Sequence, residues 1–220
     1  MLVSVHVPKC AGTSLRLALE QAYGRDRVHL DYDDRLGYPT SPINLDPVGF
    51  FRNAQESGYP FLAGKDAVHG HFHIHKYNSL KNAMRITFVR EPISRMLSHY
   101  YYWKAAPADD HPLRNYVSEK NLTIFQFANL PYIKNFYTSH YFNKVDMKIF
   151  DFIGIHELYD DGIAFVSSIS GIDIIPITSN TNVYPDYENQ VAKILSDSST
   201  VSALRDSLRD DVEFYERLCR

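Results

Sequence analysis

Short apolar segments alternate with helical patterns along this chain, and that alternation restricts the possible folds more than any other feature. The strand-like segments are LVSVHV (2–7), RVHL (27–30), AVHGH (67–71), RITFV (85–89) and DFIGI (151–155). The helical patterns cover Thr13–Tyr23, Pro92–Lys104, Tyr159–Ser170 and a long stretch over Ser199–Leu218. Strands that alternate with helices predict an α/β fold, a three-layer sandwich whose central parallel sheet is flanked by helices.

The length of the chain favours one domain over residues 1–220. With 220 residues, 45% of them hydrophobic, the chain can bury one core of ordinary size. Two stretches break the strand–helix rhythm: residues 31–62, rich in Asp, Pro, Gly and Tyr, and residues 105–145, with short helical pieces at 122–129 and 132–137. Insertions of this kind usually shape a substrate cleft, and the alternative is that both are loops without a function.

Charge and cysteine content exclude several classes of protein. The 23 basic and 26 acidic residues give a net charge of −3, so a broad nucleic-acid-binding surface is not expected. Cys10 and Cys219 stand at opposite ends of the chain and do not form a disulfide framework. The start of the sequence does not read as a signal peptide, and no run of about 18 apolar residues occurs. We therefore expect no membrane span and a cytoplasmic protein.

The segment HVPKCAGTSLRLAL (6–19) predicts a strand, a tight turn and a helix that together bind an anion. In a parallel sheet, the turn from the first strand into a helix presents backbone N–H groups to a phosphate. Gly12 would let the backbone approach, Thr13 or Ser14 would cap the helix, and Lys9 would face the helix N-terminus across the anion. The arrangement is P-loop-like, although the Gly-Lys-Ser/Thr ending is missing. The alternative is an ordinary turn with a surface lysine.

A second segment, RITFVREPISRMLSHYYYW (85–103), repeats this logic. Arg90 stands at the end of a strand and Ser98 lies two turns into the following helix, so both are candidates to bind a second phosphate. Arg95 is spaced to pair with Glu91 and is read as structural. Two anion sites on neighbouring strand ends predict a nucleoside ligand with phosphates on two sides.

PKCAGTSL (8–15) and VREPISRMLSHYYYW (89–103) resemble the 5′-phosphosulfate and 3′-phosphate binding elements of the PAPS-dependent sulfotransferases. PAPS is 3′-phosphoadenosine-5′-phosphosulfate. The likeness is to the carbohydrate branch that contains the heparan and chondroitin uronyl 2-O-sulfotransferases. HGHF (69–72), FDFIGIHELYDDGIAFV (150–166) and LRDDVEFYERL (208–218) are similar to further segments of the family. The stretches 31–62 and 105–145 do not align by eye, and they would select the acceptor.

The resemblance implies a sulfotransferase that moves the sulfuryl group of PAPS to a hydroxyl of an acceptor, expected to be a glycan, without a metal. The cofactor-binding residues implied by the matching motifs are Lys9, Gly12, Thr13, Ser14, Leu15, Arg90 and Ser98. The family's essential His-Gly-His places a catalytic base at His71, with His69 as support. Lys9 would also act in catalysis by neutralising the charge that grows on the leaving bisphosphate.

Four histidines follow one another at every second position in HGHFHIH, as His69, His71, His73 and His75. If this segment were a strand, all four rings would share one face and could bind a metal. FHIHKYNSLKNAM, however, reads as a turn into a helix, and no acidic residue stands nearby in zincin spacing. A base at His71 is favoured, because sulfuryl transfer to a hydroxyl requires a proton acceptor with a pKa near 7 at the cleft. His73 and His75 are read as surface or supporting residues.

Two features receive weaker interpretations, and three other functions stay open. Glu157 is read first as a structural N-terminal helix cap and second as a partner of His71. Residues 179–182 would close over the adenine or the phosphates. The main rival function is a P-loop nucleotide kinase or NTPase, which would require the missing Gly-Lys-Ser/Thr and a Mg²⁺-binding Asp. A metal-dependent hydrolase built on the histidines is the next alternative function, and an inactive binding module is the last.

Overall fold

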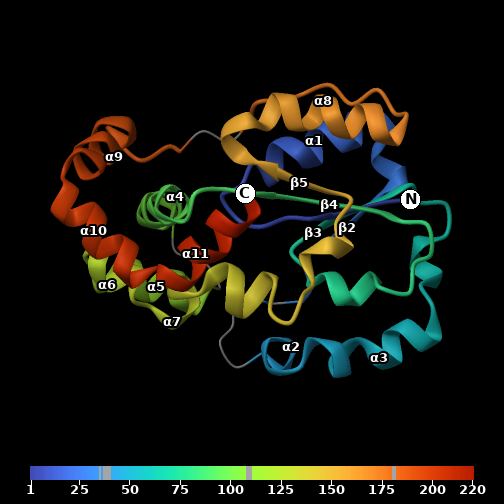
Figure 1. The fold of residues 1–220 in the computed structure, drawn as a ribbon, viewed down its shortest axis with the longest axis horizontal. Helices are drawn as coiled ribbons and strands as arrows, with labels where there is room; N and C mark the ends of the chain where they lie inside the picture. The colour runs from blue at the N-terminus through green and yellow to red at the C-terminus, as the bar shows by residue number, and fades with distance from the viewer. Residues whose placement is uncertain (35, 37–40, 108–110, 180–181) are drawn as a thin grey trace. The chain divides into compact units, whose positions relative to one another are not determined.

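One parallel sheet organises the described part of the chain. The structure, a computed structural model, describes residues 1–34, 36, 41–107, 111–179 and 182–220. Within them five strands lie in the order β2-β3-β1-β4-β5, and every neighbouring pair is parallel (Figure 1). The strands are β1 (Leu2–Val5), β2 (Val28–Asp31), β3 (Ala67–Gly70), β4 (Met84–Val89) and β5 (Phe152–Ile155). All five fall on the predicted segments.

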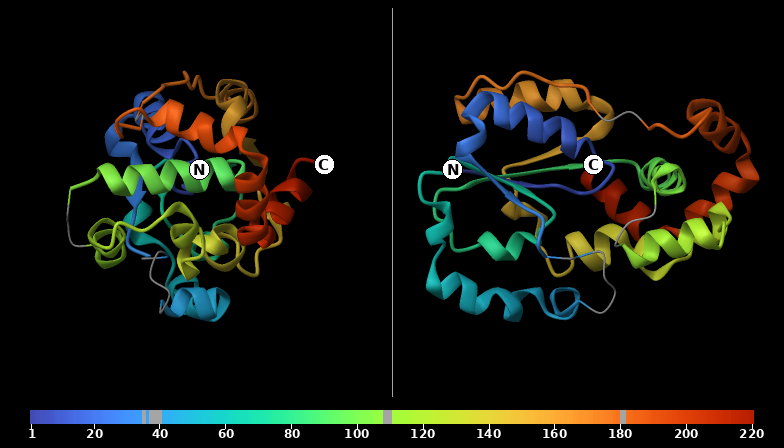
Figure 2. Two further views of the ribbon diagram at one scale, coloured as in Figure 1. Left: turned by 90° about the vertical axis from the view of Figure 1, so that its left-hand side faces the viewer. Right: turned by 180° about the vertical axis from the view of Figure 1, so that it is seen from behind.

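Helices cover both faces of this sheet, which confirms the predicted α/β architecture. α1 (Gly12–Tyr23) and α8 (Tyr159–Ser170) lie on one face (Figures 1 and 2). α2 (Pro42–Leu45) and α3 (Pro47–Ser57) lie on the other. The central strand β1 is buried along its whole length, as expected of a parallel strand that is covered on both sides.

The parallel register brings the carboxyl ends of the strands to one edge. Val5, the last residue of β1, pairs with Gly70 of β3 and with Thr87 of β4. On the outer strands Asp31 pairs with Gly70, and Ile155 pairs with Val89. The segments that leave β1, β3 and β4 therefore start side by side.

The chain divides into two compact units. The first, Met1–Arg90 with Tyr137–Asn180, contains the sheet, and the second is Glu91–Phe136 with Thr181–Arg220. In its described residues the second unit is helical, with α4 (Pro92–Ala105), α5 (Pro112–Glu119), α6 (Ile124–Ala128), α7 (Pro131–Lys134), α9 (Tyr187–Ser196), α10 (Ser198–Ser207) and α11 (Arg209–Leu218). Arg95 is fully buried there, and its guanidinium lies 3.8 Å from the centre of the Phe136 ring. Such a position fits the structural role expected of Arg95.

The long C-terminal helix predicted over Ser199–Leu218 is wrong, because the helix is interrupted at Leu208. α10 ends at Ser207 and α11 begins at Arg209, while Leu208 itself has φ −105° and ψ 20°. The side chain of Leu208 is completely buried. α10 packs against α6, α9 and α4, whereas α11 packs against α4. The interruption lets the two helices reach different neighbours, and helical periodicity along the sequence does not record this.

Two further expectations about local structure are also corrected. Residues 31–62 are not only an excursion over the surface, because they contain α2 and α3, which bury Ile43 and Phe51. The predicted helix after His73 is absent from the described residues. In its place a short 3₁₀ turn, Ile74–Tyr77, follows the strand.

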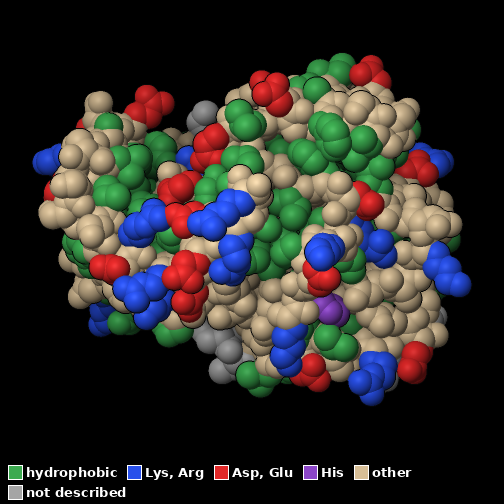
Figure 3. Space-filling view, viewed as in Figure 1, with side chains coloured by type: hydrophobic (Ala, Val, Ile, Leu, Met, Phe, Trp, Pro, Cys, Tyr) green, Lys and Arg blue, Asp and Glu red, His purple; other side chains and the backbone are tan. Residues whose placement is uncertain are grey.

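The surface keeps some apolar side chains exposed. Hydrophobic groups gather on the face that carries α8 (Figure 3), where Leu158, Phe165 and Ile169 are exposed. Basic and acidic side chains are interspersed on the same view of the molecule. Among the described residues, no helix combines the length and the hydropathy that crossing a bilayer requires.

Candidate functional site

Three of the predicted site residues leave the sheet at the same edge, within the first unit. Lys9 belongs to the loop after β1, His71 directly follows β3, and Arg90 directly follows β4. Because β1 lies between β3 and β4, the three segments start from neighbouring strands. This edge is where ligands bind in open parallel sheets.

The loop between β1 and α1 has an unusual backbone. Lys9 and Ala11 both have left-handed φ values, 69° and 62°, although neither is a glycine. Such values are strained in residues with a Cβ, and they cluster at functional sites. Left-handed residues in a turn direct successive N–H groups inward and form an anion-binding concavity. The loop therefore has the backbone expected of a phosphate-binding turn.

The first turn of α1 differs from the prediction in its capping. Ala11 occupies the N-cap position without a side-chain hydrogen bond, so the predicted cap at Thr13 or Ser14 is wrong. The Ser14 hydroxyl instead exchanges hydrogen bonds with the backbone of Ser179, accepting from its N–H at 3.0 Å and donating to its C=O at 3.2 Å. The Leu15 side chain is buried in the core, and its N–H donates to the Ala11 carbonyl.

Gly12 makes room for a histidine that the sequence analysis did not single out. A Cβ on Gly12 would lie 1.7 Å from Cδ2 of His6, so no larger residue fits beside this ring. His6 follows β1 and its N–H donates to the Gly70 carbonyl at 2.7 Å. His6 could have been recognised from its position in the sequence, because its imidazole stands directly between the apolar strand and the Pro-Lys of the loop.

His6, His69 and His71 form a buried cluster of imidazoles. The ring of His6 lies 5.1 Å from that of His69 and 4.4 Å from that of His71, centre to centre. Nδ1 of His69 lies 2.9 Å from the Ser4 hydroxyl oxygen. Nδ1 of His6 and Nε2 of His71 are buried without a hydrogen-bond partner in the described structure, whereas the Gly12 backbone lies within hydrogen-bonding reach of His69. Unpaired buried nitrogens are costly, so the cluster has the composition of a ligand or proton-transfer site.

Burial controls the charge of this cluster and of Lys9. It lowers the pKa of His71 to about 4 and, together with the neighbouring His71, that of His69 to about 3. His71 is therefore a neutral ring at pH 7 that can accept a proton, but its pKa lies below the value near 7 expected of the base. Burial and the adjacent Arg90 lower the pKa of Lys9 to about 8. Two cations thus stand close together, an arrangement that an anion would stabilise.

Arg90 is held at the end of β4 by a tyrosine and an acidic residue. The Tyr137 hydroxyl accepts the Arg90 N–H at 3.0 Å and donates to the Arg90 carbonyl at 2.7 Å. Glu157 lies 3.7 Å from Nε of Arg90, an ion-pair distance, and in the part of the chain that the structure describes this nitrogen has no hydrogen-bond partner. Glu157 thus contacts Arg90, which is neither of the partners expected for it. Tyr137 also was not singled out from the sequence.

Ser98 lies on α4 in the second unit, whereas Lys9, His71 and Arg90 belong to the first. Ser98 is buried, and its carbonyl accepts a hydrogen bond from the Asn182 amide at 3.1 Å. Of the segment 179–182, Ser179 contacts Ser14 in the first unit, whereas Asn180 and Thr181 lie outside the described residues.

The four alternating histidines do not share one face, because β3 ends at Gly70. His73 is buried, and its Nε2 lies 3.0 Å from the Asn143 carbonyl oxygen. His75 is partly exposed and lies beside His73, with 3.3 Å between their Nδ1 atoms. In the described chain no three His, Cys, Asp or Glu side chains are grouped so that they could bind a metal ion.

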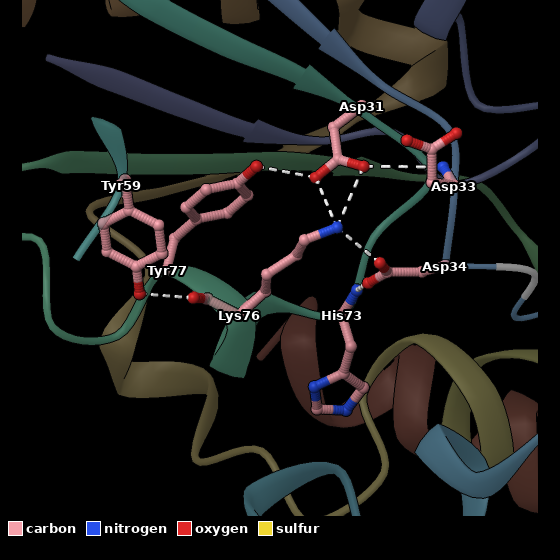
Figure 4. A network of polar contacts seen from close by, with 7 residues as sticks. All are labelled: Asp31, Asp33, Asp34, Tyr59, His73, Lys76 and Tyr77. Atoms are coloured by element: carbon pink, nitrogen blue, oxygen red, sulfur yellow. Dashed lines mark hydrogen bonds and ion pairs between the residues drawn. The ribbon is translucent and has the colours of Figure 1, made fainter. Parts of the chain in front are cut away.

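A buried polar network fixes the segment after His71 to the end of β2 (Figure 4). The Lys76 ammonium lies 2.8 Å from Asp31 and 2.5 Å from Asp34, and the Tyr77 hydroxyl donates to Asp31 at 2.6 Å. The His73 N–H donates to Asp34 at 3.2 Å. Burial raises the pKa of Asp34 to about 6, although Lys76 opposes the shift. The network ties residues 73–77 to β2 and so restrains His71 at the sheet edge.

Comparison with known proteins gives one family. A model described as "Sulfotransferase family" matches residues 1–216. Among solved structures, the crystal structure of a sulfotransferase from Alicyclobacillus acidocaldarius is similar, with a TM-score of 0.40 and 15% identity over 94% of this chain and 95% of that chain. No significant match is found among curated proteins. The family match extends across both units.

Proposed function

The chain belongs to the sulfotransferase family, and on that premise we propose that it transfers the sulfuryl group of PAPS to a hydroxyl of a carbohydrate. The observation that carries the proposal is the sheet edge itself. There β1, β3 and β4 supply two neighbouring cations, Lys9 and Arg90, and a buried neutral imidazole, His71. A phosphosulfate donor needs the cations, and a hydroxyl acceptor needs the base.

The residues of the first unit would divide the reaction between them. His71 takes the proton of the acceptor hydroxyl as its oxygen bonds to sulfur, and His69 supports the base. Lys9 and the N-terminus of α1 stabilise the charge that develops on the 5′-phosphate as its bond to sulfur breaks. The 3′,5′-bisphosphate leaves, so catalysis consists of positioning, proton removal and electrostatic stabilisation.

Residues on both strand ends would hold the donor. The backbone of Gly12, Thr13 and Ser14 surrounds the 5′-phosphosulfate, and Leu15 contributes by packing α1 into the core. Arg90 would bind the 3′-phosphate; among the described residues its Nε lacks a hydrogen-bond partner and lies at ion-pair distance from Glu157. Ser98 is proposed as the second ligand of that phosphate. No step requires a metal.

We also propose the class of the acceptor and the domain organisation of the enzyme. Similarity to the uronyl 2-O-sulfotransferases suggests a glycan, and residues 31–62 and 105–145 would shape its cleft. We also propose that the two units form one sulfotransferase domain, which is supported by the single family match across both. A cytoplasmic location stays a prediction. The kinase and hydrolase alternatives are not favoured by the family match.

The test uses calorimetry followed by transfer of a labelled sulfuryl group. We expect adenosine 3′,5′-bisphosphate to bind in roughly the micromolar range with EDTA present, and ATP with Mg²⁺ to bind far more weakly. Sulfur-labelled PAPS incubated with a panel of glycans should then label one class of them. Equal affinity for the two nucleotides, or a need for Mg²⁺, would move the protein to the kinase class.

A further inference from the structure

We propose that Tyr137 is a positioning residue that holds the two anion-binding elements, the loop after β1 and the end of β4, at the separation a 3′,5′-bisphosphate requires. The inference rests on the proposed function and assigns a role to a residue outside both cofactor motifs. Tyr137 begins a π-helical turn, Tyr137–Tyr141, and is completely buried. Isolated π turns occur frequently at functional sites.

The first contact of Tyr137 fixes the end of β4. The last pair of the β4–β5 ladder is Val89 with Ile155, so Arg90 is the first residue beyond it. The Tyr137 hydroxyl bonds both polar groups of the Arg90 backbone, accepting from its N–H at 3.0 Å and donating to its C=O at 2.7 Å. Two bonds to one residue fix its backbone and therefore the point from which the guanidinium extends.

The second contact fixes the loop after β1. Sγ of Cys10 lies 3.5 Å from the Tyr137 hydroxyl oxygen, and Cys10 stands between the two left-handed residues, Lys9 and Ala11. The Cys10 thiol also lies 3.8 Å from the Pro8 carbonyl oxygen, to which it can donate, so its sulfur contacts both the loop backbone and the phenol oxygen. A single oxygen joins the loop to the strand end.

The two elements need such a restraint because they carry like charges. Arg90 contributes to the lowered pKa of Lys9, so the two cations repel each other when no anion lies between them. A neutral buried phenol connects the backbones without adding charge. A ligand with phosphates on both sides then meets two sites already at the right distance, whereas a monophosphate uses only one.

The experiment compares three ligands with the wild type and Tyr137→Phe, which removes one oxygen and keeps the ring. We expect the dissociation constant of adenosine 3′,5′-bisphosphate to rise about 10-fold, and those of adenosine 5′-phosphate and adenosine 3′-phosphate to change less than about 2-fold. General loss of structure would weaken all three ligands alike. In an Arg90→Ala background the Tyr137→Phe effect should disappear, because the second element is already lost.

Tyr100→Phe is the matched control. It removes a buried hydroxyl that donates to a backbone carbonyl, that of Leu122 at 2.9 Å, and it should change the binding of none of the three ligands. Thermal unfolding establishes that each variant is folded. If Tyr137→Phe does not fold, Cys10→Ala tests the loop contact alone and should give the same selective loss, smaller in size.

The outcomes separate the two proposals. Failure of the wild type to bind the bisphosphate contradicts the proposed function. Binding by the wild type with no loss in Tyr137→Phe, or with equal loss for all three ligands, overturns the positioning role while leaving the function intact. If Cys10→Ala is tested instead, binding of the three ligands that is unchanged, or weakened equally for all three, also overturns the positioning role of Tyr137.

Discussion

At the scale of single residues, burial decides which chemistry each histidine can perform. His71 is half-buried with its Nε2 enclosed, and this burial lowers its pKa to about 4, so its ring stays neutral down to a pH near that value. Its Nε2 has no hydrogen-bond partner in the described structure, which leaves a lone pair or a proton unsatisfied. His73 is more deeply buried, but its Nε2 contacts the Asn143 carbonyl. The two rings are chemically alike and differ in what their nitrogens contact.

His71→Ala should therefore reduce turnover by about 10²–10⁴-fold and leave the affinity for the bisphosphate nearly unchanged. In the wild type, activity needs the neutral ring, so it should fall as the pH drops through about 4, and not near 6.5. Steady-state kinetics as a function of pH, with calorimetry, checks both statements.

Variants of the neighbouring histidines serve as controls for this prediction. His75→Ala should have near-normal turnover, His69→Ala an intermediate loss, and His73→Ala reduced stability with near-normal turnover per folded molecule. A metal site would instead make several substitutions comparably damaging, and a chelator would inactivate the wild type. Full activity in His71→Ala would show that His71 is not the catalytic base.

At the scale of elements, the junction between β1 and α1 depends on a glycine for steric reasons. The His6 ring fills the space that a Cβ on Gly12 would need, so the start of α1 and the histidine cluster are packed against each other. A change at either residue must move the other.

Gly12→Ala is expected to destabilise the protein by about 1–3 kcal/mol, because the new methyl group would overlap the imidazole. Combining it with His6→Ala should recover part of this loss, since the small side chain frees the space. Urea unfolding of the two single variants and the double variant measures the coupling. Additive effects would mean that the two residues do not compete for space.

The elements of the sheet were predictable because strands leave a local signal. Each of the five strands is a short, mostly apolar run, and the breaks after β1, β3 and β4 located Lys9, His71 and Arg90 at one edge. The helices α2 and α3 were missed because both begin with a proline, Pro42 and Pro47. Proline is favoured in the first turn of a helix, yet in a segment rich in Asp and Gly it reads as a loop signal.

The rest of the candidate site could not be predicted, because it depends on contacts between distant parts of the chain. The Tyr137 hydroxyl contacts both Cys10 and Arg90. The sequence around Tyr137 resembles other aromatic segments of the chain, and it does not indicate that this hydroxyl joins two distant residues. Leu208 interrupts a regular helical pattern for the same reason, since the partners of α10 and α11 are set by tertiary packing.

At the scale of the molecule, folding keeps several histidines of the first unit neutral. Those whose pKa is lowered mainly by burial include His6, His69, His71, His73 and His156. In the unfolded chain these rings titrate near 6.5, so below that pH the unfolded state binds more protons than the folded state. Their contribution to stability is present above 6.5 and is lost as the pH falls toward their folded values. Asp34, whose pKa is raised, opposes this between about 6 and 4.

We therefore expect the free energy of unfolding to drop by more than about 3 kcal/mol between pH 7 and pH 4.5. Urea denaturation followed by circular dichroism at steps of pH measures it, and the slope should correspond to uptake of more than one proton. Stability that is unchanged from pH 7 to pH 5 would contradict the charge state assigned to these histidines.

The strand order has a consequence for how the protein acquires its structure. β1 is the central strand, yet both of its neighbours, β3 and β4, follow it at a distance along the chain, and β5 joins β4 only after residues 91–136 have been passed. Every pairing in the sheet is non-local, which makes folding slow in comparison with helical proteins of this size. Until β3 and β4 dock, the apolar LVSV strand has two open edges, a template for association with other chains. Yield on refolding should therefore depend on protein concentration more steeply than the stability of the finished fold would suggest.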